Sequence, residues 1–197
     1  MKSPYNYVIS PSGERYNNSV DVEGKSLIVN TEIFNHEYVN REAKVHSCPT
    51  MLDTSIKPGA KAIVHHNVFR RWYDVKGVER NSKAWFNEDK YIVSNEQIFL
   101  YDNGDGWKAV DGFTFVQPLK LQKDFITDEQ EDPTRGVVVY NDGTHSKGDI
   151  VSFTPFSKYE FVVEGKRLYR VYNKFITIKY EHQGNEESYN PSWAQSS

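Results

Sequence analysis

Short apolar segments separated by turn-forming residues recur along this 197-residue chain. They are rich in Val, Ile, Tyr and Phe, and no long stretch has the 3.6-residue periodicity of a helix. This pattern predicts an all-β fold. In the C-terminal half the predicted strands are Phe113 to Val116, Gly136 to Tyr140, Asp149 to Phe153, Tyr159 to Val163, Leu168 to Tyr172 and Phe175 to Lys179. Six short strands suit a small β-barrel.

The strand pattern occurs twice, which indicates an internal duplication. Segment 6–11 matches 113–118 at an offset of 107 residues. The later matches, which involve 41–45, Gly59 and the segment that starts at Tyr91, come at offsets of 94, 89 and 78. A falling offset means that the second copy keeps the strands and shortens the loops between them.

The duplication predicts two small domains. The first spans 1–102 and the second spans 107–181, with a linker at 103–106 and a flexible, polar tail at 182–197. Each predicted domain is a small β-barrel. The hairpin turn at Glu164-Gly165-Lys166 needs the positive φ that glycine adopts without strain.

The turn-forming segment Asp102-Asn103-Gly104-Asp105-Gly106 also resembles the start of a calcium loop. A complete EF-hand loop places glutamate at its twelfth position, and counting from Asp102 that position is Phe113. A linker therefore explains this segment better than a metal site does.

Composition narrows the classes of function. Aromatic residues make up 14% of the chain, which favours strands, and the formal net charge of −3 is spread over interspersed acids and bases. This balance argues against nucleic-acid binding and against attraction to an anionic membrane. Cys48 has no partner for an internal disulfide, and no apolar signal segment follows Met1. These features predict a cytoplasmic protein without a membrane span.

A polar loop follows the first predicted strand. Residues 11–30 are rich in Ser, Asn, Asp and Glu, a composition that disfavours independent folding. Within the loop, Leu27, Ile28 and Val29 form an apolar triplet after Gly24. The triplet is either a buried strand of the barrel or a segment that becomes ordered on a partner.

Several motifs occur in the same order in both copies, and together they resemble the GroES-type co-chaperonins. In the second copy they are Arg135-Gly136-Val137-Val138-Val139, Lys147-Gly148-Asp149-Ile150-Val151-Ser152-Phe153, the hairpin at Glu164-Gly165 and the closing segment from Val171 to Ile178. In the first copy, Gly59-Ala60-Lys61-Ala62-Ile63-Val64 lacks the aspartate usual after the glycine, whereas Glu96-Gln97-Ile98-Phe99-Leu100 ends the domain as the family does.

The resemblance implies two tandem GroES-like barrels and a partner for the loop. In that family, a mobile loop after the first strand carries a glycine and an apolar triplet that binds a GroEL-type chaperonin. Gly24, Leu27, Ile28 and Val29 occupy the matching place, although two residues separate Gly24 from the triplet. The implied protein is a homo-oligomeric ring that closes the chaperonin chamber over an unfolded client. It is not an enzyme and needs no cofactor or metal, because the chaperonin uses the ATP.

The second copy departs from this pattern. Its corresponding segment, 119–134, is charged around Phe125 and Ile126, so it predicts a poor mobile loop, or at most a degenerate anchor. GroES carries a roof hairpin between its second and third strands, whereas only 49–57 and 141–147 occupy that place here. Phage-encoded co-chaperonins of this fold also lack the roof, so the resemblance extends to a phage-encoded form.

The first copy gains residues between its third and fourth motifs. This insertion, 65–90, predicts an extended hairpin with an aromatic surface for a subunit or another protein. The candidate interface residues are Phe69, Trp72, Tyr73, Trp85 and Phe86.

Other chemistry has weak support in the sequence. Adjacent His65 and His66 would face opposite sides of a strand and would not chelate one metal ion. Arg70 to Tyr73 could stack on single-stranded nucleic acid, but no second basic patch supports that interpretation. Outside the chaperonin hypothesis, the alternative is a structural or virion-associated assembly protein that reuses the barrels without binding chaperonin.

Overall fold

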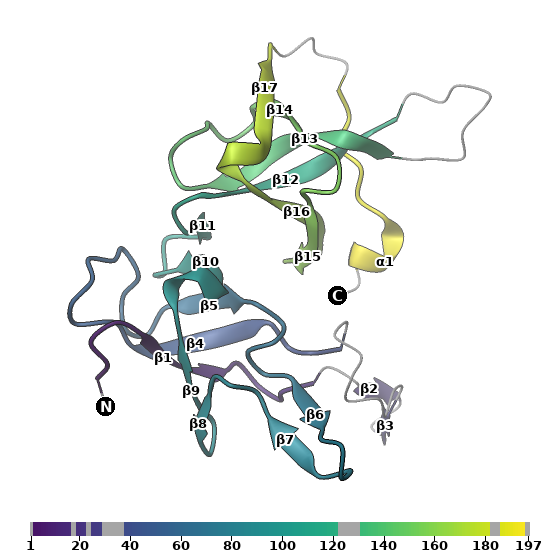
Figure 1. The fold of residues 1–197 in the computed structure, drawn as a ribbon. Helices are drawn as coiled ribbons and strands as arrows, with labels where there is room; N and C mark the ends of the chain where they lie inside the picture. Colours follow the sequence, from purple (N-terminus) through teal and green to yellow (C-terminus); the bar gives the residue numbers. More distant parts are fainter. Residues whose placement is uncertain are drawn as a thin grey trace. The chain divides into compact units, whose positions relative to one another are not determined.

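A computed structural model describes residues 2–16, 19–22, 25–28, 38–121, 131–181 and 186–195. The chain divides into two compact units, Met1–Trp107 and Lys108–Ser197 (Figure 1). Antiparallel strands dominate both units, and the described helical elements are short: η1 (Asn95–Gln97), η2 (Asn173–Phe175) and α1 (Ser192–Gln195). The all-β prediction is therefore confirmed.

The first unit contains a main sheet and two separate hairpins. Its strands are β1 (Tyr7–Pro11), β2 (Ser19–Val22), β3 (Lys25–Ile28), β4 (Glu42–Ser47), β5 (Lys61–Val64), β6 (Arg71–Tyr73), β7 (Glu79–Asn81), β8 (Trp85–Asn87), β9 (Lys90–Val93) and β10 (Ile98–Asp102). In the main sheet these strands lie in the order β10-β5-β4-β1-β9-β8. Strands β2 and β3 form one hairpin, and β6 and β7 form the other.

The second unit begins with the short strand β11 (Lys108–Ala109) and contains one six-stranded sheet. Its strands are β12 (Phe113–Lys120), β13 (Glu131–Asn141), β14 (Ile150–Phe153), β15 (Tyr159–Val163), β16 (Lys166–Tyr172) and β17 (Ile176–Tyr180). They lie in the order β17-β14-β13-β12-β16-β15. Each of the six strands predicted for this half has a counterpart in the sheet.

The two main sheets have the same strand order, once each strand is matched to its copy. They also share irregularities: the β1–β4 register shifts between Val8 and Ile9, and the β12–β13 register shifts between Phe115 and Val116, 107 residues later. Gly59 and Gly148 have nearly the same φ, +93° and +92°, each at the turn before the third matched strand. The duplication inferred from the sequence is therefore present in the topology.

Alternating side chains explain why these segments form half-buried strands. In β4, Ala43 and Val45 are fully buried while Lys44 between them is exposed. In the second unit, one core cluster consists of Val116, Val138, Val151, Phe153, Tyr169 and Val171, contributed by four strands. Burial of these apolar side chains is the main force that holds each unit together.

The predicted closure into barrels is not present in the described strand pairings. The sheet of the second unit ends at β15 on one side and at β17 on the other, and these edge strands are not neighbours in its order. Both main sheets are open among the described residues. A closed barrel requires its first and last strands to pair, and such pairing cannot be inferred from the hydrophobic pattern of each strand alone.

The β15–β16 hairpin has the predicted turn. Val163 pairs with Lys166, and the two residues between them, Glu164 and Gly165, have φ values of +50° and +70°. Two consecutive positive φ values define the type I′ geometry that matches strand twist.

Part of the tail predicted at 182–197 contacts the sheet of the second unit. Within the described part, 186–195, the backbone N–H of Lys120 donates to Glu187 O at 2.7 Å, and Ala194 is fully buried. The side chains of Lys120 and Glu187 also form an ion pair at 3.1 Å. Polar composition predicted mobility, but the end of β12 offers unpaired backbone groups that the tail satisfies.

Strand β12 passes so close to Gly136 in β13 that a larger residue there would collide with it. A Cβ at this position would lie 2.7 Å from Gln117 O and 3.0 Å from the Val116 Cβ. We expect Gly136→Ala to lower the free energy of unfolding of the second unit by about 1–3 kcal/mol, because the backbone must shift. The matched position in the first unit holds the exposed Glu42, so Glu42→Ala should change stability by less than about 0.5 kcal/mol. Urea denaturation of both variants measures the difference, and equal stabilities would contradict it.

Candidate partner-binding surface

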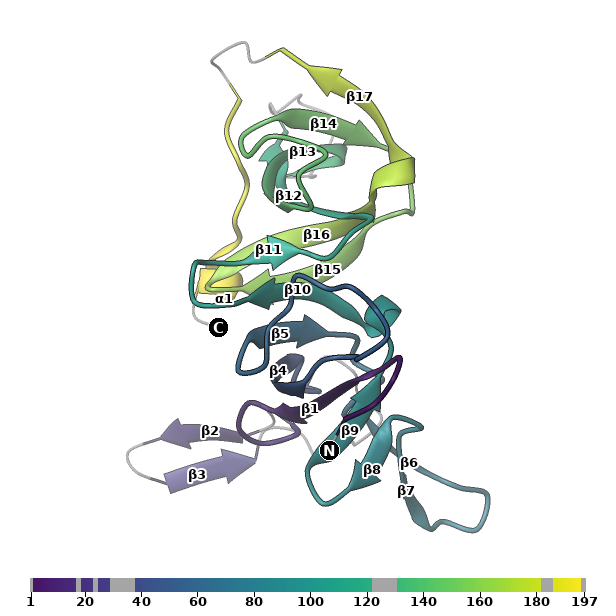
Figure 2. The ribbon, with the colours of Figure 1, turned by 90° about the vertical axis from the view of Figure 1, so that its left-hand side faces the viewer.

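The proposed chaperonin-binding residues fall on the β2–β3 hairpin and its ends. Leu27 and Ile28 lie in β3, where they pair with Val20 and Ser19 of β2 (Figure 2). Gly24 and Val29 lie outside the described residues. The assignment of these four residues to partner binding stays a prediction.

The β2–β3 pairing differs from the expectation that 11–30 does not fold by itself. The segment Ser-Val-Asp-Val alternates polar and apolar residues, Lys-Ser-Leu-Ile places its two apolar residues together, and Glu-Gly connects the two segments. A two-residue connection that contains glycine favours a hairpin. The average polarity of the loop concealed this local pattern.

The hairpin joins the first unit through a neck, which consists of residues 15–16 on the outgoing chain and 39–40 on the returning chain, and these two segments pair with each other. Tyr16 forms an antiparallel bridge with Val39, and the Asn40 N–H donates to Arg15 O at 2.9 Å. The buried Asn40 side chain reinforces this pairing, because its Nδ2 donates to Ser12 O at 3.0 Å. The loop therefore leaves the unit at a position fixed by hydrogen bonds.

The neck is also bound to the insertion. Arg15 Nη2 and Nε both donate to Phe69 O, at 2.9 and 3.2 Å, and Arg15 Nη1 donates to Asn81 Oδ1 at 2.9 Å. The Arg71 N–H donates to the Tyr16 hydroxyl at 2.7 Å, and the Arg71 guanidinium lies over the Tyr16 ring, 5.0 Å from its centroid. Two consecutive neck residues thus hold both ends of the β6–β7 hairpin.

Phe69 does not belong to an exposed interface. Its side chain is fully buried and packs edge-to-face on Tyr91, with 4.8 Å between ring centroids. The sequence placed Phe69 with the surface aromatics because it precedes Arg70 and Arg71, but it lies in the core beneath the insertion.

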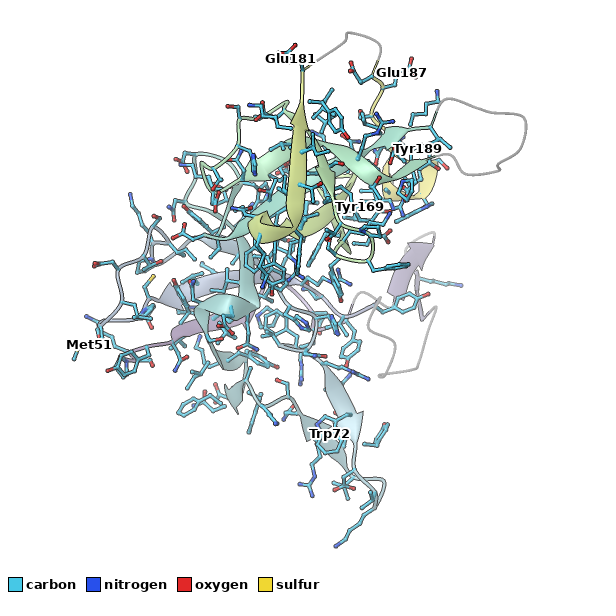
Figure 3. The ribbon with its side chains drawn as sticks, turned by 45° about the horizontal axis from the view of Figure 1, so that its top comes forward. Met51, Trp72, Tyr169, Glu181, Glu187 and Tyr189 are labelled. Carbon is cyan, nitrogen blue, oxygen red and sulfur yellow. The ribbon has the colours of Figure 1, made fainter. Side chains whose placement is uncertain are left out.

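The other four candidate interface residues are exposed. Trp72, Tyr73, Trp85 and Phe86 have between 41% and 46% of their surface accessible, and Figure 3 shows Trp72 on the hairpin. The indole N–H of Trp72 donates to Asn81 O and that of Trp85 to Glu88 O. Because the indole donors are already satisfied, the exposed area of both rings offers apolar contact.

The two tryptophans line one surface pocket with polar residues between them. Its lining also includes Asp74, Glu79, Arg80, Asn81 and Ser82. Tryptophan and arginine are enriched in protein interfaces, whereas aspartate, glutamate and serine are depleted there, so the two tryptophans and Arg80 are the residues of this lining most typical of an interface.

Two ion pairs link residues of the β6–β7 hairpin. Arg71 pairs with Glu79 at 2.9 Å, and Arg80 pairs with Asp74 at 3.0 Å. The pKa of Asp74 is lowered mainly by the hydrogen bond that its carboxylate accepts from the backbone N–H of Val78, and also by the hydrogen bond and positive charge of the Arg80 guanidinium. Asp74 is therefore ionised at neutral pH and fixes the turn between the two strands.

The second unit closes the corresponding neck differently. Glu131, the first residue of β13, accepts from the Tyr169 hydroxyl at 2.5 Å and contacts the Arg167 guanidinium, with Lys158 Nζ at 3.3 Å. Burial and the negative charge of Glu131 both raise the pKa of Tyr169 (labelled in Figure 3). A compact ionic cluster replaces the insertion that braces the first neck.

The two segments considered as metal sites, the turn at 102–106 and the histidine pair at 65–66, make other contacts in the structure. Asp102 Oδ1 accepts the backbone N–H groups of Gly104 and Gly106 at 2.7 and 2.9 Å, so this carboxylate holds a turn. His65 and His66 follow β5 rather than lie on a strand, and their rings are in contact with centroids 4.3 Å apart. No cluster of three or more potential metal-ligating side chains occurs in the described parts of the chain.

Among the residues that the structure describes, none of the helices has the length and apolar character needed to cross a bilayer.

The sequence did not single out the neck residues Arg15, Tyr16 and Asn40. Their partners are largely main-chain groups, such as Phe69 O and Arg71 N, which exist at every position and leave no sequence signal.

Comparisons with models of known protein families, with curated proteins and with solved structures found no match.

Proposed function

We propose that the chain is a tandem GroES-like co-chaperonin whose two units derive from small β-barrels. It assembles into a ring that caps a GroEL-type chaperonin while a client folds inside. The chaperonin supplies the ATPase activity. The observation that carries this proposal is a loop that follows the first strand, leaves through a fixed neck and holds Leu27 and Ile28 in its hairpin.

Two further observations support the proposal. The matched strand orders of the units agree with a duplicated co-chaperonin module. Segments 49–57 and 142–147 contain no strand, which agrees with a lid that lacks a roof hairpin, as in phage-encoded forms. The residues assigned to chaperonin contact are Gly24, Leu27, Ile28 and Val29.

Weak contacts suffice for such a lid. A loop that becomes ordered on binding loses conformational entropy, so each copy alone binds weakly. Several loops on one ring act at a high effective concentration, and capping becomes tight yet reversible.

Size-exclusion chromatography with a bacterial GroEL-type chaperonin tests this function. We expect co-elution with ATP present and none without nucleotide, because the proposed lid closes the chamber during the ATP-dependent folding cycle of the chaperonin. Absence of co-elution with both a standard chaperonin and that of the native host would contradict the proposal.

The second candidate is a structural or virion-associated assembly protein. The β2–β3 pairing favours it, since a hairpin already paired in the isolated chain gains less order on a partner. Amide exchange separates the two: rapid exchange at Val20 to Ile28 supports the lid, whereas protection supports the assembly protein.

A further inference from the structure

The insertion contacts the chain where the β2–β3 loop leaves the first unit, which suggests a role beyond its exposed aromatics. Arg15 and Tyr16 immediately precede the loop, and each binds a different part of the insertion: Phe69 O and Asn81 on one side, Arg71 on the other. The β6–β7 hairpin has no counterpart between β14 and β15 of the second unit. Among the described residues, a hairpin of this kind therefore contacts the neck of the first unit and has no equivalent at the neck of the second.

The contacts of Arg15 suit a rigid attachment. Its half-buried guanidinium makes three hydrogen bonds and lies over the Tyr91 ring, 5.6 Å from the centroid. A planar guanidinium with several fixed acceptors loses little freedom per hydrogen bond and sets the direction of the chain that bears it. Asn81 is held in β7 by its pairing with Arg71.

We propose that the insertion is a brace for the partner-binding loop and that Arg15 is its positioning residue. This inference rests on the proposed function. Each loop of a ring must reach a separate site on the chaperonin, so a fixed exit direction raises the effective concentration of the loops that remain unbound. Loss of the brace lowers affinity without changing any residue that touches the partner.

The test compares Arg15→Ala and Asn81→Ala with Lys76→Ala. Lys76 is the control because it is a basic residue that lies exposed in the turn between β6 and β7. We expect the first two variants to weaken chaperonin binding by about tenfold or more, and Lys76→Ala to retain it. The double variant Arg15→Lys with Asn81→Asp replaces the Arg15–Asn81 hydrogen bond by an ion pair and should recover part of the affinity, which separates positioning from a general loss of stability.

Amide exchange at Tyr16, Val39 and Asn40 gives a second readout that does not depend on a chaperonin. We expect it to accelerate by about tenfold or more in Arg15→Ala, with exchange in β12 and β13 unchanged. Unchanged exchange at the neck overturns the brace. Faster exchange with undiminished binding overturns the positioning role. If the unmodified protein does not bind chaperonin, the proposed function fails while the exchange result still decides whether the brace exists.

Discussion

Replacing Ile28 by aspartate is expected to abolish ATP-dependent co-elution with the chaperonin. A buried aliphatic side chain contributes about 1.5–3 kcal/mol, and a carboxylate placed in an apolar groove adds a desolvation cost. Affinity should fall by at least about 100-fold for each loop, and the loss multiplies over a ring of several loops. Chromatography with ATP, followed by titration of the complex, measures the effect.

The second unit offers the matched control. Ile126 lies in the corresponding charged segment, and Ile126→Asp makes the same chemical change in a loop that we expect not to bind. This variant should co-elute like the unmodified protein. Loss of binding in Ile126→Asp alone would assign the anchor to the second copy, and retention in both variants would place the chaperonin contact at residues other than Ile28 and Ile126.

Replacing Phe69 by alanine is expected to destabilise the first unit by about 3–5 kcal/mol, the usual cost of removing a fully buried phenylalanine. Phe69 packs on Tyr91, and its backbone carbonyl accepts two hydrogen bonds from Arg15. The variant should therefore lower the thermal transition of that unit and also loosen the neck of the loop. Calorimetry measures the first effect and amide exchange at Tyr16 measures the second.

Phe86 provides the comparison within the same insertion. It is 46% exposed, so Phe86→Ala should change the free energy of unfolding by less than about 1 kcal/mol. If Phe86 belongs to an interface between subunits, its replacement should instead shift the oligomeric state at fixed protein concentration. If Phe86→Ala lost as much stability as Phe69→Ala, the result would contradict the conclusion that Phe69 lies in the core while Phe86 is exposed.

The necks of the two units are held by different contacts. The first is held by Arg15 against main-chain and amide acceptors, and the second by Glu131 with Arg167 and Tyr169. In the second unit, Glu187 of the C-terminal tail also binds Lys120 beside the neck. This arrangement agrees with a second unit that builds the lid rather than grips the chaperonin.

The all-β class, the duplication and the six strands of the second unit could all be predicted from the amino-acid sequence. These features depend on local physics: side chains alternate along a strand, and residues such as Gly165 permit the backbone angles of a tight turn. The falling offsets also located the insertion, because added residues leave the flanking strands in the same order.

The burial of individual aromatic side chains and the contacts that hold the loop could not be predicted without the three-dimensional structure. Phe69 and Phe86 have the same side chain, but one lies beneath a hairpin and the other at an edge strand. Arg15 binds a main-chain carbonyl, a group that every residue carries. The open sheets and the docked tail depend likewise on which backbone edges meet in space. Such contacts arise from long-range packing, so no local pattern of residues specifies them.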